Sequence, residues 1–343
     1  MTMIIEYRMA NIAALRSIVS SQRHALVLLG IIALCLVDGS SPPPSSGPWG
    51  SDHVGKPVPE YVTGDECLFC HRDKIGPSWG NNWHNRTVRD VDPKAPALAA
   101  LESAVDLKHF ATDIKAVLGG RQRVRFLKPA AAYGKLDLLS VSWQPPQGAE
   151  AGKLLDTKQP HWDADRFGAA CAGCHATAVD SKERAFSARS LECYVCHGEV
   201  SLEHSKNTAL VHLSRKRKDS ARVVTSICAQ CHARTGKSRS TGLPYPNNFV
   251  AGDNLFRDFQ VDLSPARLKR QNPADAHVLE NIRNVELRGQ EEVTCLSCHD
   301  VHKESTKKHH LVQQSDLCLH CHNATGSKKL RKAYEVHSQT CEY

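Results

Sequence analysis

The sequence has few large apolar side chains. Aromatic residues make up only 6% of its 343 residues, and there are only 3 methionines. Burial of large apolar side chains is the main force that builds an ordinary protein core, and a chain of this length needs many of them. We therefore expect something other than side chains to fill part of the interior.

The sequence also lacks a hydrophobic run of comfortable membrane-spanning length. The apolar stretch Ala25–Val37 has about 13 residues, the length of a signal-peptide core, and arginines precede it. This pattern predicts an export signal, or an N-terminal anchor, over residues 1–39. A Pro- and Ser-rich flexible linker follows at residues 40–60. Cys35 lies inside the apolar run, so lipidation there is an alternative to cleavage near residue 39.

Cysteine, in contrast, is abundant. Twelve of the 14 cysteines form six CxxC pairs, and a histidine follows every pair directly. The six motifs are Cys67-Cys70-His71, Cys171-Cys174-His175, Cys193-Cys196-His197, Cys228-Cys231-His232, Cys295-Cys298-His299 and Cys318-Cys321-His322. CxxCH is the attachment motif of c-type haem: the two thiols bind the vinyl groups as thioethers, and the histidine is the proximal iron ligand.

Zinc is the alternative partner for CxxC pairs. A zinc site of this type combines two cysteine pairs, so that four cysteines bind one ion, and the residue that follows the second cysteine does not matter. Here histidine follows each time, in a chain with an export signal. The sequence therefore predicts six covalently attached haems c, held by the twelve motif cysteines.

The formal net charge of +8 raises the question of nucleic-acid binding. Six haems bring about twelve propionate charges, partly offset by the ferric iron centres. The net charge of the loaded protein then lies near zero. We therefore assign the basic excess to the propionates and expect no nucleic-acid partner.

The second axial ligand decides between an electron carrier and a catalyst, because two histidines saturate the iron. Besides the six motif histidines and His24, twelve histidines remain as distal candidates. They are His53, His84, His109, His161, His204, His212, His277, His302, His309, His310, His320 and His337.

Local context ranks these candidates. His302 lies three residues after His299, His204 follows His197 by a short loop, and His84 follows the first motif. We predict six distal ligands and keep His161 in reserve, with His309 as the alternative to His310. The six are His84, His204, His277, His302, His310 and His337.

The motifs and the histidines after them resemble bacterial multihaem cytochromes c of the doubled-CxxCH type, which include the tetrahaem carrier serving hydroxylamine oxidoreductase. The resemblance rests on Cys67–His71 with Trp83-His84, on Glu192–Gly198 with His204, and on Cys298–His302, and it spans roughly residues 61–343. It implies a mainly α, loop-rich fold organised around packed haems. It also implies that His84, His204 and His302 are distal ligands.

One segment reads differently. Apolar spacing predicts a helix over residues 97–118, and two strand-like runs follow at Val124–Leu127 and Leu136–Trp143. We expect a haem-free insert with β structure at about residues 121–165, inside a hexahaem domain over residues 61–343.

These features predict an exported electron-transfer protein of the periplasm or the cell surface, with redox donor and acceptor proteins as partners. Two alternatives stay open. One is a multihaem oxidoreductase with one open haem site, and the other is a subunit of an extracellular cytochrome filament. The N-terminal segment also allows association with a membrane.

Overall fold

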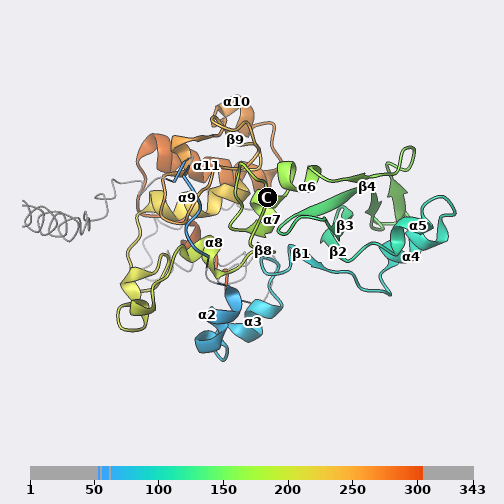
Figure 1. Ribbon diagram of the computed structural model, residues 1–343. Coiled ribbons are helices and arrows are strands. Elements are labelled where there is room, and N and C mark those ends of the chain that lie inside the picture. Colours follow the sequence, from blue (N-terminus) through green and yellow to red (C-terminus); the bar gives the residue numbers. More distant parts are fainter. Residues whose placement is uncertain (1–52, 55, 62, 304–343) are drawn as a thin grey trace, which may run out of the picture. The chain divides into compact units, whose positions relative to one another are not determined.

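The computed structural model describes residues 53–303, except residues 55 and 62 (Figure 1). The chain divides into two compact units, Met1–Ser46 and Gly47–Tyr343, and all described residues belong to the second. The export segment, the sixth motif and the histidines from His309 onward lie outside the described residues.

An antiparallel sheet forms one part of this unit. Its strand order is β1-β2-β3-β4-β5, and β6 pairs with β4 (Figure 1). The strands are β1 Val88–Asp90, β2 Ala116–Gly119, β3 Val124–Pro129, β4 Leu136–Gln144, β5 Lys153–Leu155 and β6 Trp162–Asp163. The two runs expected to be strands are present as β3 and β4.

The sheet is buried on both faces, and alternation along β4 divides its side chains between them. Leu139 and Val141 pack with the helices α4 (Pro96–Ser103) and α5 (Lys108–Ala111). Leu136 and Leu138 belong to a second cluster, which contains Phe167 and Ala172 beside the second CxxCH motif. The second face of the sheet therefore supports a motif.

The expected helix over residues 97–118 is wrong in its second half. The helices α4 and α5 occupy 96–103 and 108–111, and Ala116–Gly119 is strand β2, paired between β1 and β3. The apolar residues Val117 and Leu118 looked helical by spacing. Val117 packs on one face of the sheet and Leu118 on the other, and both faces are covered. Both residues are therefore buried, which their spacing in the sequence does not indicate.

The motif-bearing part is built from short helices joined by loops and tight turns. The α-helices are α2 Gly64–His71, α3 Gly76–Gly80, α6 Arg166–Ala170, α7 Ala172–His175, α8 Cys193–His197, α9 Ala221–His232, α10 Pro265–Leu268 and α11 Pro273–Arg288. The 3-10 turns are η1 Leu202–Ser205, η2 Thr208–Leu210, η3 Leu255–Arg257 and η4 Cys295–Ser297. Two small ribbons pair β7 Ala176–Thr177 with β8 Ala188–Arg189, and β9 Lys237–Ser238 with β10 Phe259–Gln260.

The two longest of these helices, α9 and α11, pack against each other (Figure 1). Ala229 of α9 shares a buried cluster with Leu279 and Ile282 of α11. The α11 helix begins at an Asn272 cap that accepts the backbone N–H of Asp275, and it ends at Gly289 with a left-handed φ of 66°. These caps define the two ends of α11, which packs beside α9, the helix of the fourth motif.

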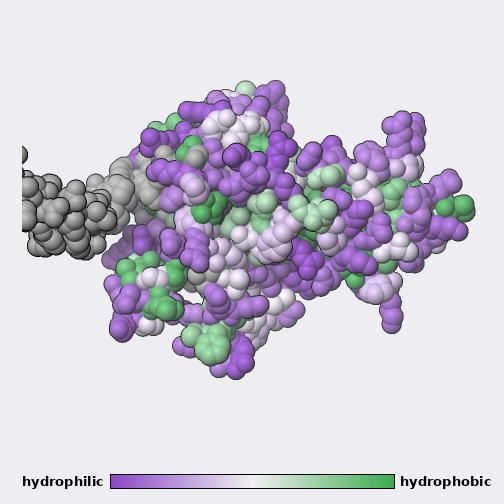
Figure 2. Space-filling view, in the orientation of Figure 1, coloured by the Kyte–Doolittle hydropathy of each residue, from purple (hydrophilic) through white to green (hydrophobic). Residues whose placement is uncertain are grey.

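Hydrophilic residues cover most of the face in Figure 2, and the apolar residues there form separate small groups. No helix among the described residues is long and apolar enough to cross a membrane.

Candidate haem-attachment sites

Four motifs occupy the last turn of a helix that ends on the motif histidine. These histidines are His71 in α2, His175 in α7, His197 in α8 and His232 in α9. Residues three and four apart share a helix face, so the cysteines and the histidine of a motif point to the same side. In the fifth motif Cys295 opens the 3-10 turn η4, and Cys298 and His299 follow it.

Cysteines of different motifs lie against each other. The thiols of Cys67 and Cys193, of Cys174 and Cys231, and of Cys228 and Cys295 lie close enough to shift each other's pKa. These contacts bring the first motif to the third, and the second and fifth to the fourth. The cysteines of five motifs therefore fall into two groups, one of the first and third motifs and one of the second, fourth and fifth, and the helix α8 of the third motif packs against α9 of the fourth.

Contacts between motifs and burial shift the pKa of these thiols in opposite directions: the contact with Cys193 lowers the pKa of Cys67 to about 7, whereas burial acts on Cys171 and Cys196. Burial raises the pKa of Cys196 to about 11, and burial is the first cause that raises the pKa of Cys171. At neutral pH such thiols stay protonated and poorly nucleophilic toward solvent species.

Three motif histidines each face a histidine from a different part of the chain. The ring centroids of His71 and His204 lie 6.2 Å apart, and those of His197 and His302 lie 5.8 Å apart. The planes of both pairs are inclined by 29°. The centroids of His84 and His232 lie 6.2 Å apart, with the planes inclined by 67°.

These separations fit one metal atom between two rings. A metal–imidazole nitrogen bond of about 2 Å on each side places the two ring centroids about 6 Å apart. The residues present therefore fit haem iron with two axial histidines at three motifs, and the three partners are those expected from the sequence: His84, His204 and His302.

In two of these histidines a hydrogen bond occupies Nδ1 and leaves the other ring nitrogen, Nε2, as the atom that can bind a metal. The Nδ1 of His197 donates to the carbonyl oxygen of His212 over 2.6 Å, and the Nδ1 of His204 donates to that of Ser201 over 2.7 Å. Metal-binding histidines use such bonds to fix the tautomer that presents Nε2 to the metal.

Burial also favours the ligating form of these rings. It lowers the pKa of His197 and of His302, and it lowers the pKa of His175 to about 4. Neutral imidazole is the form that binds iron, so each ring is available as a ligand at neutral pH.

The remaining expected ligands are placed less completely. The Nδ1 of His175 is buried with no hydrogen-bond partner, and its ring is paired with no described histidine. His277 lies in α11 and His299 follows η4. The reserve residue His161 lies exposed at the sheet, where its Nδ1 donates to the carbonyl of Gln159. Cys318, Cys321, His322, His310 and His337 lie outside the described residues.

Two spare histidines pair instead with buried carboxylates, which the sequence analysis did not foresee. The Nδ1 of His53 lies 2.8 Å from the carboxylate of Asp253, 200 positions away, and the Nδ1 of His212 lies 2.9 Å from Asp219. Nothing in the local sequence marks the distant partner of His53.

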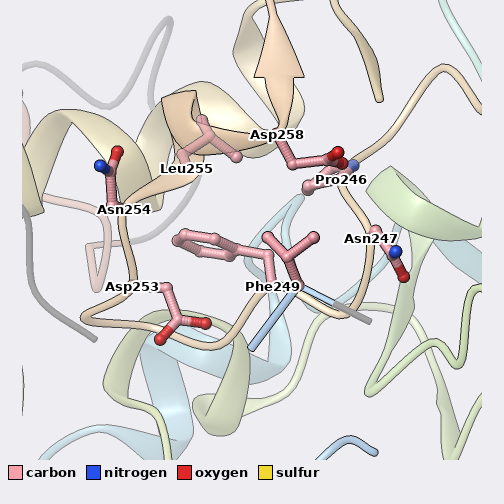
Figure 3. A pocket seen from close by; sticks show the side chains of 8 residues that line it. Pro246, Asn247, Phe249, Asp253, Asn254, Leu255 and Asp258 are labelled. Atoms are coloured by element: carbon pink, nitrogen blue, oxygen red, sulfur yellow. The ribbon is translucent and has the colours of Figure 1, made fainter. Parts of the chain in front are cut away.

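Asp253 also lines a small pocket with Phe249, Asn254 and Asp258 (Figure 3). No motif cysteine or histidine lines this pocket. Within residues 53–303, no group of three or more His, Cys, Asp or Glu side chains is arranged to hold a metal ion.

No family model matches this sequence, and no curated protein matches it. Among solved structures, the undecahaem cytochrome from the S-layer of Carboxydothermus ferrireducens is similar, with 15% sequence identity and a TM-score of 0.44. The match covers 87% of this chain and 46% of that one, so this chain spans less than half of its length.

Proposed function

We propose that this protein is a multihaem cytochrome c that carries electrons through six covalently bound haems. The observation that carries the proposal is the set of three cross-motif histidine pairs, with ring centroids 5.8–6.2 Å apart. Each pair joins one motif histidine to one histidine expected to be a distal ligand.

The proposed ligand pairs cross between motifs. His204, which follows the third motif, completes the site of His71 in the first. His302, beside the fifth motif, completes the site of His197 in the third. His84, which follows the first motif, completes the site of His232 in the fourth. Each segment thus attaches one cofactor and supplies a ligand to another.

A bound haem supplies a one-electron couple at its iron, and two imidazoles saturate that iron so that no substrate binds it. The protein's own residues then have three tasks. The cysteines hold the cofactor, the paired histidines orient it, and the cysteine contacts across motifs keep the attachment points close. Close spacing supports transfer from site to site, in a mainly α multihaem fold.

Export and partners complete the proposal. Covalent haem attachment in bacteria takes place outside the cytoplasmic membrane, in agreement with the signal expected at residues 1–39. We assign the protein to the periplasm or the cell surface, where a redox protein donates electrons and another accepts them.

An oxidoreductase with one open haem site is the second candidate, because His175 pairs with no described histidine. A ligand from outside the described residues, His310 or His337, fits the carrier. An open iron at His175 fits the enzyme.

Mass spectrometry and spectroscopy of the mature protein test the proposal. We expect six haem additions that survive denaturation, only low-spin ferric signals in electron paramagnetic resonance, and little carbon monoxide binding after reduction. His204→Ala should keep all six additions and convert one haem to a carbon monoxide-binding form. Fewer than six additions, or bound zinc, would falsify the hexahaem proposal. A high-spin signal from one haem in the unaltered protein would favour the enzyme.

A further inference from the structure

Asn82 is a fully buried polar side chain between the end of α3 and His84, with 0% of its surface exposed. Its side-chain amide nitrogen donates to the carbonyl oxygens of Val301 over 2.6 Å and of Lys303 over 3.0 Å. Its side-chain oxygen accepts the backbone N–H of His84 over 2.9 Å and lies 3.2 Å from the Nδ1 of the same residue.

The hydrogen-bond network fixes the orientation of this amide. Two carbonyl oxygens only accept, so the NH₂ group must face Val301 and Lys303. The oxygen then faces two N–H groups of His84, and the amide uses both of its donors and both acceptor positions. Such a saturated, buried network is rigid, since any rotation leaves a buried polar group unsatisfied.

The two ends of this network are both proposed distal ligands. Val301 and Lys303 flank His302, so the amide holds the backbone on both sides of that residue. At the other end it holds the backbone and the ring of His84. Trp79 of α3 contributes an edge contact to the ring of His302, with the centroids 6.4 Å apart.

We propose that Asn82 is a positioning residue that orients two distal iron ligands at once, His84 for the site of His232 and His302 for the site of His197. The inference rests on the proposed function. Acceptance of the Nδ1–H of His84 leaves its Nε2 for the iron, the usual effect of a second group bonded to a metal-binding histidine.

Coupling of two sites through one side chain has a distinct consequence. Loss of the amide releases both ligands together, although they lie 218 positions apart in the sequence. His84→Ala and His302→Ala each remove one ligand and thereby identify the spectral signal of one haem. A change at Asn82 should move both signals.

Asn248 provides the matched control. It is also a buried asparagine, whose oxygen accepts the backbone N–H of Ser181 over 2.8 Å and whose amide nitrogen donates to the carbonyl of Lys56. It joins segments 192 positions apart but contacts no proposed iron ligand. Asn248→Ala therefore reproduces the cost of a lost buried amide without a change at a ligand.

The experiment compares Asn82→Ala, Asn248→Ala, His84→Ala and His302→Ala in the mature protein. Mass spectrometry first counts the haems, and electron paramagnetic resonance of the ferric protein and carbon monoxide binding to the reduced protein follow. We expect Asn82→Ala to keep six haems, to shift the two signals assigned by the histidine variants, and to raise carbon monoxide binding at those two haems. Asn248→Ala should leave all signals in place.

Other outcomes distinguish a failure of this inference from a failure of the proposed function. Signals unchanged in Asn82→Ala, or shifted as much in Asn248→Ala, mean that Asn82 has only a structural role. Fewer than six haems in the unaltered protein means that the proposed function has failed instead. If Asn82→Ala yields no folded protein, Asn82→Asp retains an acceptor for His84 and loses the amide donor. Both signals should then shift, because loss of the amide donor releases His302 and the carboxylate accepts more strongly from His84, and a shift on neither haem overturns the inference.

Discussion

At the scale of single residues, Asp219 fixes the loop that precedes α9. Its carboxylate accepts hydrogen bonds from the Nδ1 of His212, the backbone N–H of Leu213 and the guanidinium of Arg217, and its side chain is 5% exposed. The same loop carries the carbonyl of His212 that accepts the Nδ1–H of His197. Asp219 thus stabilises the loop whose carbonyl oxygen accepts the hydrogen bond from the motif histidine His197.

We expect Asp219→Asn to destabilise the protein by about 2–3 kcal/mol at neutral pH, the range for hydrogen bonds to a buried charge. Burial raises the pKa of Asp219, but the bonds from His212, Leu213 and Arg217 outweigh it, so the folded-state pKa is lowered. The stabilisation is therefore full above the unfolded pKa of about 3.9 and is lost as the pH falls through the lower folded value.

Denaturant unfolding at pH 7 and at pH 3 measures this difference. The gap between the unaltered protein and Asp219→Asn should narrow at the lower pH. Asp262→Asn is the control, because this aspartate is fully exposed and its pKa is lowered mainly by hydrogen bonds from Ser264. An equal gap at both pH values contradicts the role of the Asp219 charge.

At the scale of elements, the two faces of β4 pack against different parts of the protein. Leu138 and Leu139 are adjacent and both almost fully buried, yet they point to opposite faces of the sheet. Leu139 packs toward α4 and α5, and Leu138 packs toward the cluster that contains Cys171 and Ala172 of the second motif.

Truncation of either leucine to alanine should destabilise the protein by about 2–5 kcal/mol, because each leaves a cavity. Only Leu138→Ala should also shift the spectrum of the haem attached at Cys171 and Cys174, identified by a His175→Ala variant. Thermal unfolding and electron paramagnetic resonance of both variants make the comparison. Equal spectral shifts in the two would show that the faces are not independent.

The elements also show how far sequence reasoning reaches. The strands β3 and β4 were predictable because their apolar residues are flanked by clear turn residues. The strand β2 was not predictable. Val117 and Leu118 are buried on opposite faces of the sheet, and the spacing of the apolar residues in this segment is the same as in a helix. Among the candidate ligands, the short distance in sequence from a motif was enough to single out His84, His204 and His302. Which proximal histidine each one faces, and the role of Asn82, depend on contacts between distant segments that no local pattern records.

At the scale of the whole molecule, side-chain cores are unevenly distributed. The sheet and its helices contain two clusters with many large apolar residues, whereas the cluster that joins α8 and α9 has only three buried members. The motif helices α2 and α8 each bury only one residue, whereas α7 packs on the sheet through Ala172 and α9 packs against α11.

We therefore expect a haem-free chain that lacks residues 1–39 to keep the sheet and to lose the motif helices α2 and α8. Hydrogen exchange followed by mass spectrometry should show protection in β2, β3 and β4 and fast exchange in α2 and α8. The mature protein, with haems attached, is the reference and should protect both parts. Protection of α8 in the haem-free chain would mean that its side chains suffice to fold it.

The crossing of ligands between motifs also has a consequence for biogenesis. During export the chain emerges from its N-terminus, so His71 and its cysteines arrive more than a hundred residues before His204, and His197 precedes His302 by a similar interval. His232 is the reverse case, because His84 has already emerged. Cofactors held at the first and third motifs would thus wait for their second histidine during export, whereas one held at the fourth motif would meet His84 on arrival.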